Sequence, residues 1–501
     1  MKKQKQPIHG ICIPLASLHS STSYGIGGFF DLLPLLDWCK EVGFTILQLL
    51  PLNDSGPDPS PYNALSSCAL NPIYLSLEKL PQIDVYALPP PPPFSPYIDY
   101  LSVQSFKLNF LRGYLKKMAP LLLSDPEVCE FIDKNSWLEN YAFFKVLKDH
   151  LAHNPWSSWP LDITPNNLTL KKQYAREIDF YILVQYLCHK QLLFVKEYAQ
   201  KQDIWLKGDI PILISKDSVD AWEKPYLFDF NFAAGAPPDY YNPEGQYWGF
   251  PLFNWEELKK EQFSWWKRRL QAASSYYSFY RLDHVVGFFR MWAIPLNKKA
   301  SEGFFLPTNP ALWTEQGEAI LSALLSFSLM TPVAEDLGQI PPSVRLSLQK
   351  LGIYSTKVMR WERNYAETGH FIPLEGYPFL SMTTLSTHDS ETLQLWWQEQ
   401  KEDAELYAKQ KGWIYSPDLS KEHRLSFLYD AHHTASHLHI NLLQEYLALF
   451  PEFVWPTPMQ ERINIPGTVR PENWAYRLRP SVEEIKRHSP LKKILTEQIL
   501  I

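Results

Sequence analysis

The feature that most constrains the fold is a strand, a helix and a second strand within the first 52 residues. Residues 10–14 form a short apolar run that predicts a strand. Apolar side chains recur three residues apart over 29–42, which predicts a helix, and Gly43 stands where a C-cap is expected. The near-continuous apolar run 45–52 is typical of a buried parallel strand. This βαβ pattern predicts an α/β fold.

Strand-like runs recur along the rest of the chain, separated by helical patterns or long insertions. The further runs are 204–212, 278–290, 331–337, 355–361, 382–389 and 462–468, with a helix predicted over 255–274. About eight strands alternating with helices predict a (β/α)8 TIM barrel. We expect one catalytic domain over 1–501, without a separate C-terminal β-domain. Its expected insertions around the mouth of the barrel are 53–72, 77–200 (mainly helical) and the loop-like 228–255.

Composition excludes several classes of protein. A net charge of −6 gives no reason to expect nucleic acid or an acidic membrane as partner. No apolar run approaches the roughly 18 residues of a membrane span, and prolines interrupt the short apolar stretch after the basic start, which argues against a signal peptide. Five widely spaced cysteines without a CxxC argue against a disulfide framework and a zinc cluster. We therefore expect a cytoplasmic protein.

Two shorter motifs allow alternative interpretations. The glycines of 24–28 could suggest a nucleotide loop, but they lack the full phosphate fingerprint, so a tight turn is the preferred interpretation. The run 89–93 predicts polyproline II structure, either an SH3-type ligand or, as we prefer, a stiff loop. The 18 Trp, 27 Tyr and 28 Phe exceed what a core of this size needs, and the surplus suits stacking against sugar rings.

Acidic residues stand at the ends of four predicted strands: Asp209, Asp283, Glu335 and Asp389. Each has a structural alternative, such as a helix-capping role for Asp389, or Asp336 as the relevant acid beside Glu335. Arg281 and Asp283 share one face of their strand and could be a structural ion pair. In a barrel, however, the strand ends converge on one mouth. We therefore expect these acids to lie together with Arg281 and His388.

Retaining glycosyl transfer gives such a group a chemical purpose. It needs a carboxylate nucleophile and a protonated carboxylic acid about 5–5.5 Å apart. Crowded like charges and partial burial raise the pKa of the acid, and a cation such as Arg281 keeps the nucleophile ionised.

The sequence resembles glycoside hydrolase family 77, the 4-α-glucanotransferases (amylomaltases or disproportionating enzymes) of the α-amylase clan. The resemblance runs along most of the chain in an ordered set of motifs: 24–27 (YGIG), 60–62 (SPY), 71–72 (NP), 208–212 (GDIPI), 237–240 (PPDY), 281–284 (RLDH), 334–338 (AEDLG), 387–389 (THD) and 464–468 (NIPGT).

The resemblance implies a role for each matching residue. Asp283 would be the nucleophile, Glu335 the general acid and base, and Asp389 the residue that stabilises the transition state. Arg281 and His388 would contact the same donor subsite as Asp389. The remaining implied substrate-binding residues are Ser60, Tyr62 and Asp209 at the donor site, and Asp239, Tyr240 and Trp248 in a mobile loop on the acceptor side.

The implied substrates are malto-oligosaccharides and α-1,4-glucans of the glycogen or starch type. Residues 250–257, 284–292 and 385–389 are most similar to the plant disproportionating-enzyme-2 branch, which would favour maltose as donor and a branched glucan as acceptor. The alternatives are an α-amylase-type hydrolase and a non-catalytic glucan-binding protein. We expect no cofactor and no metal ion, because the acids have catalytic roles and no calcium loop is evident. The sequence makes no prediction about oligomeric state.

Overall fold

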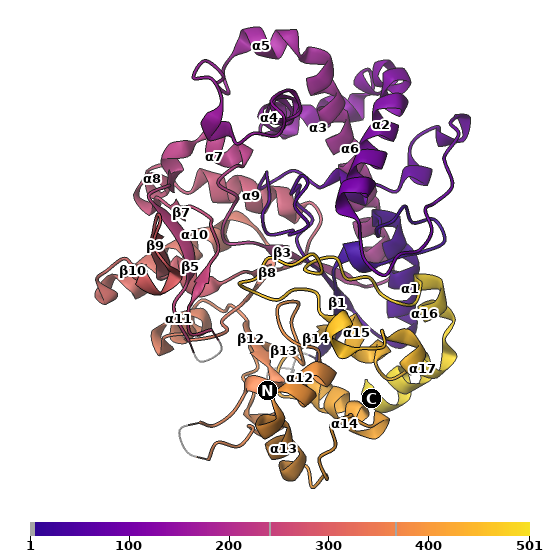
Figure 1. The fold of residues 1–501 in the computed structure, drawn as a ribbon, viewed down its shortest axis with the longest axis vertical. Coiled ribbons are helices and arrows are strands. Elements are labelled where there is room, and N and C mark those ends of the chain that lie inside the picture. The colour runs from indigo at the N-terminus through magenta and orange to yellow at the C-terminus, as the bar shows by residue number, and fades with distance from the viewer. Residues whose placement is uncertain (1–5, 240–241, 366–367, 501) are drawn as a thin grey trace.

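A parallel barrel of eight strands forms the centre of the molecule (Figure 1). The computed structural model describes residues 6–239, 242–365 and 368–500. The strands are β1 (Ile8–Ile13), β2 (Ile46–Leu49), β3 (Trp205–Ile210), β8 (Phe279–Leu282), β11 (Thr331–Ala334), β12 (Ser355–Val358), β13 (Ser381–Thr384) and β14 (Leu438–Leu442). They pair in the order β11-β8-β3-β2-β1-β14-β13-β12.

The two ends of this sheet meet and close the barrel. A parallel bridge joins Val333 to Tyr354, and the N–H of Ala334 donates to the carbonyl oxygen of Tyr354 at 2.7 Å. The hydroxyl of Thr356 donates to the carbonyl oxygen of Ala334 at 2.8 Å. The predicted (β/α)8 barrel is therefore confirmed.

The eighth strand is not the one that the sequence predicted. Residues 462–468 lie in a loop, since Pro466 lacks an N–H and Gly467 has a φ of 72°. The eighth strand is instead β14, which pairs with β1 and β13. Its sequence, LHINL, interrupts the apolar run with His439 and Asn441, both of which are buried.

Helices surround the barrel, and the first of them ends as predicted. Helix α1 (Leu32–Val42) stops at Gly43, whose φ of 96° is a left-handed C-cap. The helix predicted over 255–274 is divided into α8 (Trp255–Lys260) and α9 (Ser264–Ser274) by positive φ angles at Gln262 and Phe263. The connections after β8 contain α10 (Trp313–Phe327), α11 (Pro342–Lys350), α12 (Leu393–Glu399), α13 (Lys401–Gln410) and α14 (Lys421–His432). After β14 come α15 (Leu443–Leu447), α16 (Val482–Arg487) and α17 (Ser489–Ile494).

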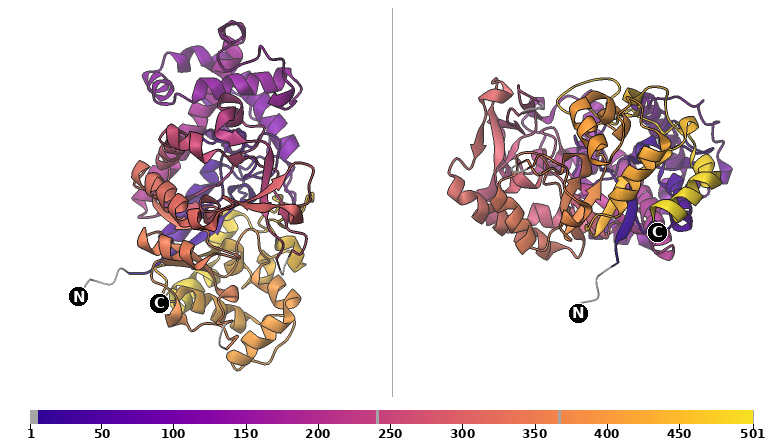
Figure 2. Two further views of the ribbon diagram at one scale, coloured as in Figure 1. Left: turned by 90° about the vertical axis from the view of Figure 1, so that its left-hand side faces the viewer. Right: turned by 90° about the horizontal axis from the view of Figure 1, so that it is seen from below.

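The long connection between β2 and β3 is mainly helical, as expected. It contains α2 (Tyr100–Leu123), α3 (Pro126–Lys134), α4 (Leu138–His150), α5 (Leu168–Gln173) and α6 (Ala175–Lys201). These helices gather at one end of the long axis of the molecule, and α13 and α14 lie at the other (Figures 1 and 2). Helix α6 also packs against α1 and β3, so it returns the chain to the barrel. Although α2 and α6 have 24 and 27 residues, the described part of the chain has no helix apolar enough to cross a membrane.

A small antiparallel sheet replaces the loop expected over 228–255. Strands β5 (Phe232–Ala236) and β6 (Gln246–Tyr247) pair with β9 (Met291–Pro295) and β10 (Phe304–Leu306) in the order β10-β9-β5-β6, beside the short pair β4 (Phe228–Asp229) and β7 (Leu252–Phe253). The pattern was missed because β5 is rich in small residues. Gly235 is needed there, since a Cβ atom would lie 2.1 Å from the carbonyl oxygen of Gln246. A short helix, α7 (Val219–Glu223), precedes this sheet.

All five cysteines are free, and four of them are buried. The treatment of the whole chain as one catalytic domain stays a prediction.

Candidate active site

The predicted acids meet at the mouth of the barrel, where the strands end. Asp209 and Arg281 are register partners on β3 and β8. Asp283 and Glu335 directly follow β8 and β11, and His388 and Asp389 follow β13. These groups surround a cleft of about 1760 Å³, whose lining includes Ser60, Tyr62, Asp239, Trp248, Arg281, Asp283, Glu335, His388 and Asp389.

Arg281 joins three of the four acids. Its Nη1 atom lies 2.9 Å from both carboxylate oxygens of Asp209. Its Nη2 atom lies 3.0 Å from Oδ1 of Asp283 and 2.8 Å from Oε2 of Glu335. The alternative of a simple structural ion pair between Arg281 and Asp283 is therefore wrong, because one buried cation faces three carboxylates.

The shared nitrogen limits the separation of Asp283 and Glu335. Oδ1 of Asp283 and Oε2 of Glu335 both contact Nη2 of Arg281. The sum of these two contact distances, about 5.8 Å, is therefore the largest possible distance between the two oxygens. Retaining glycosidases hold their carboxyl groups about 5–5.5 Å apart, whereas inverting ones need roughly 6.5–9.5 Å to admit a water molecule. The mouth of this barrel therefore fits a retaining reaction.

Glu335 is the acid whose pKa is raised toward neutrality. Burial and the neighbouring charges of Asp283 and Asp389 raise the pKa of Glu335 to about 7, against the opposing effects of Arg281 and the backbone of His284. The N–H of His284 donates to Oε2 of Glu335 at 2.9 Å. His284 has a φ of 40°, a left-handed conformation of the kind that collects at functional sites.

Asp283 is held by two donors on different elements. Besides Arg281, the N–H of Ile212 donates to its Oδ2 atom at 3.1 Å. Its side chain is 18% exposed toward the cleft. A carboxylate oriented in this way at the mouth can act as a nucleophile.

The pKa of Asp389 is shifted in the opposite direction from that of Glu335. Burial would raise the pKa of Asp389, but His388 and the side-chain amide of Asn464 outweigh it and hold that pKa below its usual range. Nδ2 of Asn464 donates to Oδ1 at 2.7 Å, and Nε2 of His388 lies 3.2 Å from Oδ2. Asp389 is thus ionised while Glu335 can carry a proton, which is the division of labour that acid and base chemistry requires.

Tyr62 connects the two sides of this group. Its hydroxyl donates to Oδ2 of Asp209 at 2.7 Å and lies 2.9 Å from Nε2 of His388. Its ring stacks on His388 with centroids 5.3 Å apart, and Trp474 lies against both rings. Asp209 itself is fully buried beneath Tyr62 and Arg281.

The other predicted residues lie farther along the cleft. Ser60 lines it, with its N–H donating to Oδ1 of Asp58 at 2.8 Å. Trp248 packs edge-on against His284 with centroids 4.9 Å apart. Asp239 accepts from the N–H of Asn242 at 2.6 Å, and Tyr240 lies outside the described residues.

Two side chains of the site were missed by sequence reasoning. Asn464 was placed in a strand, which hid its contact with Asp389, although it begins a loop motif typical of the family that the sequence resembles. Trp474 stands in a polar stretch without strand or helix periodicity, and its only signal was its residue type.

A closed (β/α)8 barrel with paired carboxylates at its mouth is the arrangement of retaining enzymes that act on glycosides. Residues 13–483 match the model of glycoside hydrolase family 77, described as 4-alpha-glucanotransferase. The chain is 46% identical over 493 residues to a 4-alpha-glucanotransferase of Chlamydia caviae, covering 96% of this chain and 92% of the relative. It is 44% identical over 507 residues to that of Chlamydia pneumoniae, covering 98% and 95%.

A solved structure agrees with these sequence relatives. The amylomaltase from Streptococcus agalactiae in complex with acarbose has a TM-score of 0.81 and 26% identity, with 98% of both chains covered. The chain therefore belongs to glycoside hydrolase family 77. Its activity is that of a 4-α-glucanotransferase acting on α-1,4-glucans, and the hydrolase alternative is not favoured.

Proposed function

We propose that this chain transfers α-1,4-glucosyl units by a retaining double displacement, with Asp283 as nucleophile and Glu335 as acid and base. The observation that supports this proposal is the contact of one Arg281 nitrogen with an oxygen of each carboxylate, because the short separation that follows is compatible with a retaining reaction. Arg281 contacts Asp283 directly, and the pKa of Glu335, raised to about 7, leaves Glu335 able to donate a proton.

In the first step, a carboxylate oxygen of Asp283 attacks the anomeric carbon of the donor sugar. Glu335 gives its proton to the glycosidic oxygen, and the leaving glucan departs with a free 4-hydroxyl group. In the second step, the ionised Glu335 removes the proton from the 4-hydroxyl of an acceptor sugar. The acceptor oxygen attacks the same carbon and releases Asp283, so two inversions restore the α configuration.

The remaining residues position the donor and the acceptor. Asp389, ionised and directed by Asn464, stabilises the positive charge of the oxocarbenium-like transition state together with His388 and Arg281. Ser60 and Tyr62 shape the donor site, and the buried Asp209 acts through Tyr62 and Arg281. We assign Asp239 and Trp248, which line the cleft, to the acceptor side. The resemblance to the family implies the same role for Tyr240.

The direct test is the variant Asp283→Asn with maltotriose as sole substrate. The unchanged chain produces a ladder of longer oligosaccharides, and we expect the variant to lose transfer by about 10⁴-fold or more. Circular dichroism and glucan binding should remain as in the unchanged chain, which separates lost chemistry from lost folding. Retained transfer would contradict the assignment of Asp283.

The donor and acceptor follow from the similarity to the disproportionating-enzyme-2 branch, which we propose as the functional branch. Maltose is then a donor, and a branched glucan such as glycogen is the better acceptor. Mass analysis of products from maltose, with and without glycogen, tests this. Equal product formation in both cases would contradict the acceptor preference. The cytoplasmic location stays a prediction.

A further inference from the structure

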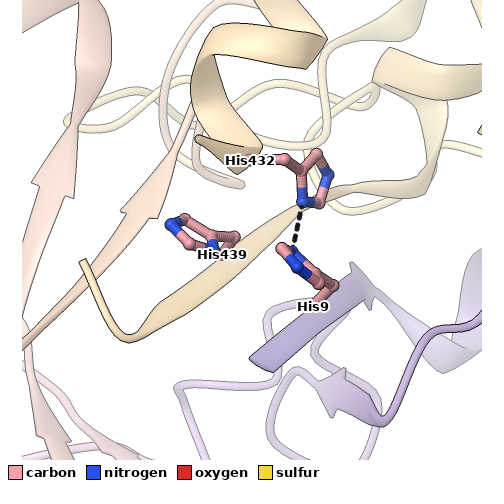
Figure 3. Close-up of side chains that lie close together, drawn as sticks. All are labelled: His9, His432 and His439. Atoms are coloured by element: carbon pink, nitrogen blue, oxygen red, sulfur yellow. Dashed lines mark hydrogen bonds between the residues drawn. The ribbon is translucent and has the colours of Figure 1, made fainter. Parts of the chain in front are cut away.

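Three histidines converge at the end of the barrel opposite the mouth. His9 on β1 and His439 on β14 are register partners near the N-terminal ends of these parallel strands. His432 is the last residue of α14, directly before the turn into β14. One ring nitrogen from each histidine lies within 4.8 Å of the others (Figure 3).

The outer nitrogens of two of these rings are already engaged by other groups. Nε2 of His432 lies 2.7 Å from the hydroxyl of Tyr446. Nε2 of His439 lies 3.1 Å from the hydroxyl oxygen and 3.2 Å from the carbonyl oxygen of Thr434. Such outer partners orient the rings, as they do around metal-bound histidines.

The inner nitrogens are less well satisfied. Nδ1 of His432 lies 2.9 Å from Nδ1 of His9. Nδ1 of His439 is buried and has no hydrogen-bond partner in the part of the chain that the structure describes, although the side chain is only 1% exposed. Buried polar atoms nearly always have a partner, so this nitrogen is evidence for a ligand.

The chemistry of the cluster suits a cation that binds neutral imidazole. Burial, together with neighbouring histidines, lowers the pKa of His9 to about 4 and lowers that of His432 and His439 as well. All three rings are therefore neutral near pH 7, with lone pairs available. The cluster has no carboxylate, which disfavours magnesium and calcium and favours a borderline metal.

We propose that His9, His432 and His439 bind one divalent transition-metal ion of the Zn²⁺ class, with a fourth position left for water. Three histidines and a water molecule are a common tetrahedral set for Zn²⁺, in which the nitrogens lie about 3.3 Å apart. The rings must therefore move slightly, and His9, the least buried of the three, is able to rotate.

Such an ion would connect the first barrel strand to the last. It would join His9 to His432, 423 positions later in the chain, beside the pairing of the first barrel strand with the last. The site lies apart from the carboxylates of the mouth, so its role is structural. This site departs from the expectation of no metal ion, which rested on the catalytic acids, the missing calcium loop and the cysteine spacing.

The test uses the full chain without a polyhistidine tag, with Zn²⁺ and Co²⁺ as probes. We expect calorimetry to find one Zn²⁺ ion per chain and Co²⁺ to give the visible absorption of a tetrahedral site. Both signals should weaken at least about tenfold in His9→Gln, a partly exposed position where folding should survive. Tyr446→Phe removes the outer partner of His432, together with the contacts of that hydroxyl with Asn441 and Gly10, and should cost about 10–100-fold in affinity.

The matched control is His423→Gln, because His423 stacks on Trp413 outside the cluster. This variant should bind both ions as the unchanged chain does. Zn²⁺ should also raise the melting temperature of the unchanged chain and of His423→Gln, but not that of His9→Gln. Absence of saturable one-to-one binding, or equal binding by His9→Gln, would overturn the proposal.

Discussion

Each end of the barrel brings polar side chains from neighbouring strands together, but these groups are charged at the mouth and neutral at the opposite end. At the mouth, Arg281 faces Asp209, Asp283 and Glu335, so several charges share one small volume. At the end opposite the mouth, three imidazoles lie close together, and burial keeps each of them neutral. In both cases two residues are register partners on neighbouring strands. The difference teaches that the barrel only brings groups together, and that their charge decides whether the site is suited to proton transfer or to metal binding.

The mouth should be the more fragile end when the cation that joins three of its acids is removed. Arg281→Gln leaves the buried Asp209 and two further carboxylates without their partner. Breaking a buried pair in this way costs about 3–5 kcal/mol of unfolding free energy. We expect a loss of that size in denaturant unfolding, together with at least a roughly 100-fold loss of transfer.

Two further variants sharpen this prediction. Lys134→Gln breaks an ion pair in which both side chains are more than half exposed, and should cost less than about 1 kcal/mol. Adding Asp209→Asn to Arg281→Gln should restore part of the stability, because one unpaired charge is removed. A loss below about 1 kcal/mol in Arg281→Gln would show that the cation is not essential to the mouth.

The acids at the mouth also predict a pH dependence of transfer. The histidines at the opposite end of the barrel take no part in it. Glu335 must be protonated to donate to the leaving glucan, and its pKa is raised to about 7. The value of kcat/KM for maltotriose should therefore be constant below that pH and fall about tenfold per unit above it. Initial rates between pH 5 and pH 9 measure this, with circular dichroism as the control for folding. A constant kcat/KM up to pH 9 would contradict the role of Glu335.

Much of the mouth could be predicted from the sequence because charged residues at strand ends are conspicuous. Asp209, Arg281 and Asp283 stand out from the apolar runs that precede them, and parallel strands bring such ends together. The histidine cluster at the opposite end of the barrel could not be predicted in the same way. His439 lies on the face of β14 that packs toward α14, opposite the cleft-lining Ile440 and Leu442, and it interrupts the apolar run. That strand was therefore missed, and 462–468 was placed at the end of the barrel instead. Without β14 beside β1, His9 and His439 had no reason to meet.

The smallest expected effect is that of metal removal on the transfer rate, because the histidine cluster and the mouth lie at opposite ends of the barrel. Removal of metal by EDTA should leave the transfer rate within about twofold when it is measured well below the melting temperature, because no metal ligand belongs to the mouth. The melting temperature itself should fall, since an ion bound only by the folded state stabilises it. Loss of transfer that returns on addition of Zn²⁺ would mean that the two ends are coupled.

The central claim is that Asp283 forms a covalent bond to the donor sugar. The most direct measurement is mass spectrometry of the Glu335→Gln variant after mixing with α-maltosyl fluoride. Fluoride leaves without help from an acid, whereas release of the enzyme needs the missing base, so the intermediate should accumulate. We predict a maltosyl adduct on the proteolytic peptide that contains Asp283. An adduct on another residue, or turnover with inversion and no adduct, would contradict this account.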